Sequence, residues 1–565
     1  MRLTEEHHGL AAESLAAKIW KHIPAACAFI LLACQTAVPW TVPHFVTTDG
    51  PSHLYGATVA RDLVFNHKHS IYSALYTIQR SVIPNWLTTV VLAATSALAG
   101  TAHAEQFFAS LSILAGFFGL SYLSRALGPE KSPWSPVMNF AVQTSYLWAG
   151  FYNFYLGMVL LPWLIGFHIR SIGRLNFSRA LVIAIGLVGL FFTHLIAAVL
   201  AITTTVAIAG WVWITGAARN GRSDPARAIA QRASAYLGLT ELGLVLLAAI
   251  PTIILILIYT HSTPPATKML EFMTDWRHFP QNTFLTGRGP AGRAAFLGPF
   301  VICFLISGAL VMTRTEWRSA RGGLLIATVI AFLCYMLVPD SGFGGAYAKG
   351  RFGWAVFILG CPLAASVARL RLVRTPIALC VAFFMFQSLE ATGREERLLS
   401  NAVLPYLSAT SQIPPRASLI RLNYATPATA ALHRYVGNAG SPFLHLDSYA
   451  AATGYDVNLT DYEQLTELFP VVFKKSIREM RYQLWGFEES GPAAETLLPW
   501  IESGLPRPVD FVLVFGDENF PGSITQGMPS TLRYLDVHMQ LIATSSDSLL
   551  RVYRRNGFVP GPAGH

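Results

Sequence analysis

The chain has 565 residues, of which 53% are hydrophobic and only 13% are charged, and its mean hydropathy is +0.44. Soluble globular proteins carry about a quarter charged residues, so the composition excludes an ordinary soluble enzyme. Apolar runs long enough to cross a bilayer recur along the first 390 positions, which predicts a polytopic α-helical membrane protein.

Basic and acidic residues are unevenly distributed along the chain. Residues 1–393 hold 27 basic and 14 acidic residues, whereas residues 394–565 hold 14 and 17. The basic excess lies mostly in short loops between apolar runs, where it indicates orientation. Because no basic arm with interleaved aromatic residues is present, the pI of 9.3 does not indicate a nucleic-acid partner.

The first apolar run, 22–40, follows Lys18 and Lys21, which predicts a cytoplasmic N-terminus over 1–21. The transmembrane domain is expected over 22–393, with outer loops at 41–83, 261–293 and 339–350, followed by an extracytoplasmic α/β domain over 394–565. Further helices are expected at 84–102, 104–126, 133–150, 151–168, 180–197, 198–215, 237–260, 294–312, 322–338, 351–368 and 375–391.

The number of crossings between residue 83 and Arg219 must be odd, because basic loops place these two points on opposite sides. Apolar length alone gives six segments there. Either two of these segments form a single long helix or one of them is a re-entrant element. The exception is expected in the 133–168 run or the 180–215 run, since both are long and uncharged. The resulting prediction is about 11 transmembrane helices, plus or minus two.

Short elements are predicted in the C-terminal tail. Strands are expected at 442–447 and 509–515, and a hairpin over 539–543 and 549–553. The ranges 459–468 and 476–485 have helical spacing, with Asp461 as a cap for the first of them.

The first outer loop contains the sequence Asp49-Gly50-Pro51-Ser52-His53 soon after the first helix. This position places the Asp49 carboxylate near the outer membrane surface, where it could deprotonate a hydroxyl group. The alternative is that Asp49 caps the helix that begins near Ser52. His53, one helical turn later, could orient Asp49, relay a proton or pack at the interface. Two ligands without a third make a metal site there improbable.

A second candidate region begins the helix expected at 351–368. Lys349 and Arg351 lie on the outer side, against the usual positive-inside distribution. A lipid phosphate would explain both cations, because guanidinium matches phosphate oxygens. The alternative is that they reach the headgroups of the outer leaflet. Tyr347, two residues before Lys349, is a further candidate substrate-binding residue.

The outer loop 261–293 is long enough to cover a cavity at membrane level. Its His261 and Arg288 are candidate substrate-binding residues, although a single charge in such a loop is more often solvated. His194, within the 180–215 run, is an ionisable group in the membrane and therefore a site hypothesis. The equal alternative is a neutral histidine that is hydrogen-bonded within the helix bundle. The six cysteines all fall in apolar runs, so neither a disulfide framework nor a thiolate metal site is indicated.

This layout resembles the GT-C superfamily of integral-membrane glycosyltransferases of the bacterial type. The Asp49-Gly50-Pro51-Ser52-His53 stretch lies where that fold carries its catalytic acid, and Lys349-Gly350-Arg351-Phe352 is similar to the basic and aromatic start of a late helix. Two features depart from the family pattern. Asp49 is followed by glycine rather than by a second acid, and the tail lacks the Trp-Trp-Asp signature of oligosaccharyltransferases.

The resemblance implies an inverting transferase that moves a sugar from a polyprenyl-phosphate donor to an acceptor hydroxyl on the extracytoplasmic side of a bacterial inner (plasma) membrane. Asp49 would be the general base, while Lys349 and Arg351 would stabilise the leaving phosphate. The acceptor could be a glycan, a lipid or a protein. No cofactor is indicated, although a divalent metal ion stays an open alternative.

Two other functions are open from the sequence. A transporter or flippase for a lipid-linked saccharide usually shows two similar halves, and no such repeat is visible. A non-catalytic scaffold with the same fold is favoured only by the isolation of Asp49 from a second acid in its loop.

Overall fold

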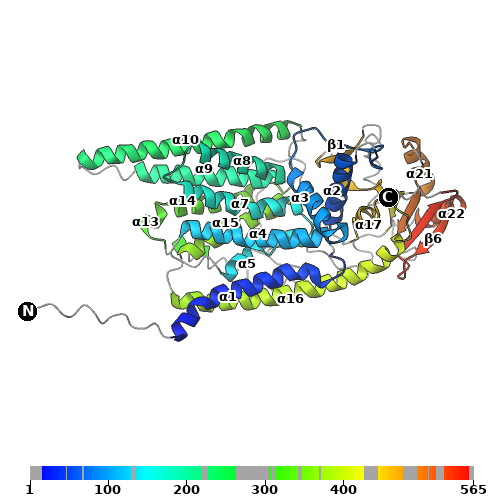
Figure 1. Ribbon diagram of the computed structural model, residues 1–565, viewed down its shortest axis with the longest axis horizontal. Helices are drawn as coiled ribbons and strands as arrows, with labels where there is room; N and C mark the ends of the chain where they lie inside the picture. Colours follow the sequence, from blue (N-terminus) through cyan, green and yellow to red (C-terminus); the bar gives the residue numbers. More distant parts are fainter. Residues whose placement is uncertain are drawn as a thin grey trace, which may run out of the picture.

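Long helices form a bundle that carries a mixed β-sheet at one end, as the computed structural model shows (Figure 1). We call this end of the bundle the domain side. The structure describes all residues except 1–14, 46, 67–68, 129–134, 218–224, 263–304, 307–308, 311, 341–346, 368–370, 425–442, 467, 475–492, 507, 517–526 and 559–565.

The bundle consists mainly of helices that are long and apolar. Its main members are α1 (Leu15–Ala37), α4 (Ala104–Leu127), α7 (Tyr152–Ser171), α8 (Phe177–Thr193), α9 (Leu195–Ala217), α10 (Pro225–Ser262), α14 (Ala320–Leu337), α15 (Ala348–Val367) and α16 (Arg371–Thr410). Within the described part of the chain, seven helices are long and apolar enough to cross a membrane, and two shorter apolar helices accompany them. The chain is therefore a multi-pass membrane protein, as predicted.

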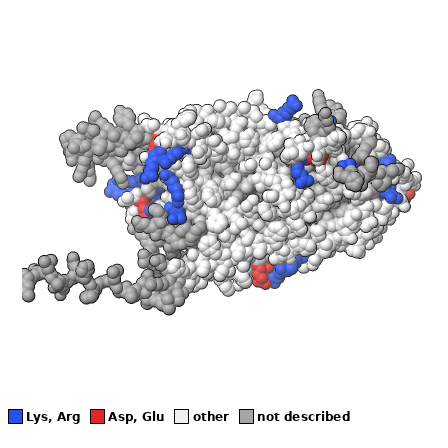
Figure 2. All heavy atoms as spheres, viewed as in Figure 1, with Lys and Arg blue, Asp and Glu red and all other residues white. Residues whose placement is uncertain are grey.

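The surface of the bundle fits a lipid environment. Large apolar side chains such as Ile185, Leu257 and Phe383 are at least 60% exposed on its helices. Figure 2 shows a broad middle region of one face with few Lys, Arg, Asp or Glu residues, and a group of basic residues at the end away from the sheet. This distribution agrees with the predicted orientation, which itself stays a prediction.

The apolar segment that does not cross the bundle from one side to the other is helix α3 (Trp86–Ala99). The prediction that this segment lies in 133–168 or 180–215 is therefore wrong. At one end of α3, Asn85 donates to the Leu468 carbonyl over 3.1 Å. Just past the other end, the Ala102 carbonyl accepts from Tyr449 over 3.3 Å. Both ends thus contact the C-terminal region on the domain side, and the chain does not change sides along these 14 residues.

The predicted helix 133–150 is broken into two short helices, α5 (Pro136–Val142) and α6 (Ser145–Trp148). Ser135 and Thr144 cap them through side-chain oxygens, and these polar starts explain the break that apolar length alone did not indicate. Most of the predicted helix 294–312 lies outside the described residues, so the total helix count stays a prediction.

The C-terminal sheet has five strands in the order β3-β2-β5-β7-β6. Its strands are β2 (Ser418–Asn423), β3 (Val457–Asn458), β5 (Phe511–Phe515), β6 (Met539–Thr544) and β7 (Leu550–Arg555). Strand β2 runs parallel to β3 and β5, whereas β7 runs antiparallel to β5 and β6. The predicted strand at 509–515 and the predicted hairpin are confirmed.

Two other predictions for the tail are wrong in part. Residues 443–445 form a turn and helix α17 (Leu446–Gly454) follows, although a strand is predicted at 442–447. A short apolar run fits either element, and here the turn decides. The predicted helix 459–468 is reduced to α18 (Tyr462–Leu465), which Asp461 caps as expected. The predicted helix 476–485 lies outside the described residues.

The C-terminal region is attached to the bundle through helix α2 (Gly50–Phe65). Strand β1 (Tyr76–Ile78), which follows α2, pairs antiparallel with β4 (Val471–Phe473). The Tyr55 hydroxyl accepts from the Asn458 backbone N–H over 2.7 Å, and the Tyr76 hydroxyl donates to the Asn458 carbonyl. Helix α16 continues through the predicted boundary between residues 393 and 394, so the proposed division into domains falls inside a helix.

Candidate active site

Asp49 occupies the N-cap position of α2, but its side chain makes no capping hydrogen bond. Pro51 stands in the first turn, where a missing backbone N–H costs nothing. The expectation that Asp49 simply caps this helix is therefore wrong. Instead, its backbone N–H donates to the Ala149 carbonyl over 3.1 Å, which fixes the residue against the α6–α7 turn.

The carboxylate of Asp49 faces residues from the C-terminal region. Tyr462 makes a side-chain hydrogen bond to it, and His445 Nε2 lies 3.8 Å from its Oδ1. Burial raises the pKa of Asp49 to about 7, partly offset by electrostatic interactions with His53 and Arg351. The Asp49 side chain keeps 19% of its surface exposed, so a reactant can reach it.

His53, one turn along α2, pairs with Glu463 from α18 through its Nδ1. The His53 ring also donates a hydrogen bond to the Gly150 carbonyl. Burial lowers the pKa of His53 to about 4 and raises the pKa of Glu463 well above its usual range, so burial favours the neutral form of each partner. The predicted proximity of His53 to Asp49 holds, and Glu463 orients the His53 ring.

Asp461 fixes α18 against α2. Its Oδ2 accepts from Ser52 Oγ over 2.9 Å, and its Oδ1 accepts from the Glu463 backbone N–H over 3.0 Å. Burial raises the pKa of Asp461 well above its usual range. Ser448 donates to the same carboxylate, which holds α17 to the same point. The acid-bearing turn 461–463 is thus locked onto the start of α2.

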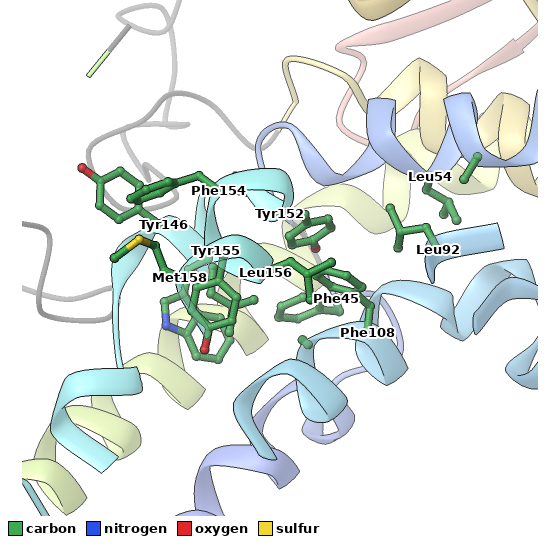
Figure 3. Close-up of a cluster of buried hydrophobic side chains, with 14 of the residues drawn as sticks. Phe45, Leu54, Leu92, Phe108, Tyr146, Tyr152, Phe154, Tyr155, Leu156 and Met158 are labelled. Carbon is green, nitrogen blue, oxygen red and sulfur yellow. The ribbon is translucent and has the colours of Figure 1, made fainter. Parts of the chain in front are cut away.

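A further buried acid, Glu105 of α4, contacts the loop that carries Asp49. Its Oε1 accepts from Tyr152 over 2.8 Å and from Thr47 over 3.3 Å. A Cβ at Gly50 would stand 2.0 Å from the same oxygen, so only glycine fits there. Figure 3 shows Tyr152 among buried aromatic side chains that include Phe108, whose ring centroid is 4.7 Å away.

The turn at residues 149–151 connects the acids to the predicted cation. Gly150 has φ +83°, and a Cβ there would stand 2.3 Å from the Gly50 nitrogen. The next side chain, Phe151, lies with its ring centroid 5.5 Å from the Arg351 guanidinium carbon. Asp49 and Arg351 therefore contact residues 149 and 151 of the same turn and interact electrostatically.

Arg351 itself, in the first turn of α15, is held between aromatic rings and an imidazole. Its guanidinium carbon lies 5.2 Å from the Phe154 ring centroid, and Nη1 lies 2.9 Å from His194 Nε2. Figure 3 shows Phe154 beside Tyr146 at one end of the buried cluster, with ring centroids 5.1 Å apart. Aromatic faces stabilise a guanidinium without neutralising it.

Other predicted residues are less close to this centre. Tyr347 has φ +60° and lies with its ring centroid 5.7 Å from that of Phe151, so it borders the Arg351 site. Lys349 is buried, and its backbone N–H donates to Asp340 Oδ1 over 3.1 Å. Residues two apart do not share a helix face, so Lys349 does not stand on the face of α15 that presents Arg351.

His261 is exposed at the end of α10, and Arg288 lies outside the described residues. Among the described residues, no hydrogen bond, ion pair or ring contact joins His261 to Asp49, His53 or Arg351. Within the same described part of the chain, no group of three or more His, Cys, Asp or Glu side chains is arranged to hold a metal ion.

Four site residues were not anticipated from the sequence. Glu463, His445 and Tyr462 come from the tail, and Glu105 begins a bundle helix. Only Glu105 carries a local signal, because an acid at the start of an apolar helix is unusual unless it has partners. The tail residues contact α2 across about 400 positions, and no local pattern reports such a contact.

The fold has counterparts among solved structures, although neither a family model nor a curated protein sequence matches the chain. ArnT from Cupriavidus metallidurans bound to undecaprenyl phosphate superimposes with a TM-score of 0.53 at 10% identity, over 95% of this chain and 98% of that one. Its apo state gives 0.50 at 11% identity, with the same coverage. Such similarity establishes the architecture: this chain has the same fold as the ArnT structures, which is the fold that the sequence predicts.

Proposed function

We propose that the chain is an inverting glycosyltransferase that moves a sugar from a polyprenyl-phosphate donor to an acceptor hydroxyl on the extracytoplasmic side. The observation that carries the proposal is the placement of a half-buried acid, Asp49, and a half-buried cation, Arg351, against the same turn of chain. A transferase of this kind needs both groups at once. A scaffold or a flippase needs neither a base nor its pKa of about 7.

In the proposed reaction, the acceptor oxygen forms a bond to the anomeric carbon while the bond from that carbon to the phosphate oxygen breaks. The acceptor proton passes to the Asp49 carboxylate. The bonding electrons leave with the lipid phosphate, whose negative charge Arg351 stabilises in a site of low dielectric constant. Attack opposite the leaving phosphate inverts the anomeric configuration.

The surrounding acids support the role of Asp49. A general base works best when its pKa lies near the operating pH, and burial gives Asp49 such a value. Glu463 and Glu105 supply the additional acids that the first loop lacks, from other parts of the chain. They keep His53, Thr47 and Tyr152 in fixed positions around the base, which preserves attack geometry.

The test is transfer from a labelled polyprenyl-phosphate sugar by purified full-length protein in lipid. Asp49→Asn keeps the size of the side chain but removes its basicity, so we expect transfer to fall by at least about a hundredfold. Asp62→Asn is the matched control, because Asp62 is a buried acid on the same helix that accepts from Asn66 over 2.7 Å. Equal activity of the Asp49→Asn variant and the wild type would contradict the proposal.

A further inference from the structure

His194 is a single residue between two bundle helices, and the proposed reaction gives it no role. It follows α8 and precedes α9 with extended backbone at φ −164°. Its ring contacts the Phe154 ring edge-on at a centroid distance of 5.2 Å. The same Phe154 ring lies against Arg351, so His194, Phe154 and Arg351 form one cluster.

The hydrogen bonds of His194 determine which ring nitrogen carries the proton. The Ile196 backbone N–H donates to Nδ1 over 3.1 Å, so Nδ1 is the acceptor and Nε2 carries the hydrogen. The neighbour of Nε2 at 2.9 Å is Nη1 of Arg351, and a guanidinium can only donate. Two donors therefore converge on one point.

Arg351 has further capacity to donate. Its Nε is buried and has no hydrogen-bond partner among the described residues. Within the same residues, no carboxylate lies within ion-pair distance of its guanidinium, and its close neighbours are the Phe151 and Phe154 rings and His194. A half-buried cation held this way is compensated best by an anion that accepts from several donors.

We propose that His194 and Arg351 together form a binding site for one oxyanion, the phosphate group of the lipid donor, with His194 Nε2–H and Arg351 Nη1–H donating to the same phosphate. The identification of the anion rests on the proposed function. The site itself rests on the convergence of two donors, the Nε2–H of His194 assigned from the Ile196 contact and the Nη1–H of the Arg351 guanidinium. His194 then contributes a neutral donor that a second cation could not replace without repelling Arg351.

The test is the affinity of the full-length protein, in lipid nanodiscs, for undecaprenyl phosphate, with undecaprenol and inorganic phosphate as comparison probes. His194→Phe keeps a ring but removes the donor. We expect it to weaken undecaprenyl phosphate binding roughly ten- to hundredfold, as the loss of one hydrogen bond to a charged group does. Binding of the uncharged undecaprenol should not change.

Two further variants control for shape and folding. His168→Phe makes the same change at a buried histidine of α7, about four helical turns from Phe154, and should leave the affinity unchanged. His194→Asn has a shorter side chain that cannot reach the anion, and it replaces the phenylalanine variant if that protein does not fold. Undiminished phosphate binding in the His194 variants would overturn the site.

The same measurements separate this site from the proposed function. If inorganic phosphate binds in a manner that depends on His194 while undecaprenyl phosphate does not bind, the anion site stands and the lipid donor is wrong. If wild type binds neither phosphate, the anion site is wrong. Loss of transfer in Asp49→Asn with an unchanged affinity in His194→Phe would support the reaction but refute the role of His194.

Discussion

The two halves of the candidate site are built in opposite ways. The acid half, around Asp49, joins α2 to a tail segment about 400 residues away through the contacts of Ser52 with Asp461 and of His53 with Glu463. The cation half, around Arg351, is made by bundle helices and aromatic rings. The position of Asp49 therefore depends on docking of the C-terminal region, whereas the position of Arg351 depends on the packing of bundle helices.

The turn at Gly150 joins the two halves, and its replacement should have the largest effect. Gly150→Ala places a Cβ 2.3 Å from the Gly50 nitrogen and forces alanine to φ +83°. We expect a loss of about 3 kcal/mol or more of unfolding free energy, from backbone strain and overpacking together, and a loss of transfer. Thermal unfolding in lipid or detergent measures the first effect.

Gly173→Ala is the matched control for that experiment. Gly173 has φ +77°, but a Cβ there would meet no atom within 4 Å. Only the backbone strain applies, and the expected cost is about 1 kcal/mol. Equal stability losses in the two variants would mean that the close approach between residues 150 and 50 does not join the halves as described.

The electrostatic link between the halves should be visible in the pH dependence of transfer. In the proposed reaction Asp49 acts when deprotonated, so kcat/KM should rise with pH through about 7, the pKa of its carboxyl group. The positive charge of Arg351 favours the carboxylate and lowers that pKa. Arg351→Gln should therefore move the acid limb to higher pH, in addition to reducing transfer about a hundredfold.

Arg351→Lys separates charge from hydrogen-bonding geometry. It keeps a cation near Asp49, so the acid limb should remain near pH 7 even though the planar guanidinium is lost. An acid limb that stays in place in Arg351→Gln would show that the two groups are too far apart to influence one another.

The buried pair in the acid half should matter less than the turn or the cation. Glu463→Ala leaves His53 without its Nδ1 partner, and we expect a cost of about 1–3 kcal/mol in unfolding free energy and a fall in transfer of about tenfold. Glu463→Gln keeps a polar partner and should lose less. The difference in unfolding free energy between each variant and the wild type measures the contribution of the pair.

Glu390 offers the contrasting case of an exposed acid. Its side chain is 53% exposed and pairs with Arg394 over 3.5 Å one turn along α16. Glu390→Ala should change stability by about 0.5 kcal/mol or less, because solvent screens such a pair. If Glu463→Ala loses no more stability than Glu390→Ala, the His53–Glu463 pair does not stabilise the site.

The same contrast explains what the sequence could predict. Asp49 was located because it follows the first helix closely, and Arg351 because a cation at that end of a helix opposes the charge trend. Glu463 and His445 were missed because their roles arise from tertiary contacts with α2. The predicted elements also differ from the structure at both residues: His445 ends a turn where a strand over 442–447 is predicted, and Glu463 lies in the four-residue helix α18 where a helix over 459–468 is predicted.

The placement of helix α3 differs from the prediction for a related reason. Its apolar length suits a crossing, but the contacts of Asn85 and Ala102 with the C-terminal region hold both ends on one side. Length and hydropathy report that a segment avoids water, not which neighbour covers it. The prediction was reliable where local chemistry decides the structure, and it failed where docking does.

The smallest effect is expected outside both halves, at the end of α10. Tyr259 there is buried against Phe191 and Ala198, which ties α10 to α8 and α9, but His261 two residues later is exposed. His261→Ala removes no described contact with either half of the site, so transfer should stay within about twofold of wild type, as surface substitutions usually do. Steady-state assays with saturating and limiting donor would detect a change in either kcat or KM. A tenfold rise in KM with unchanged kcat would place substrate against the end of α10 and extend the site beyond Asp49 and Arg351.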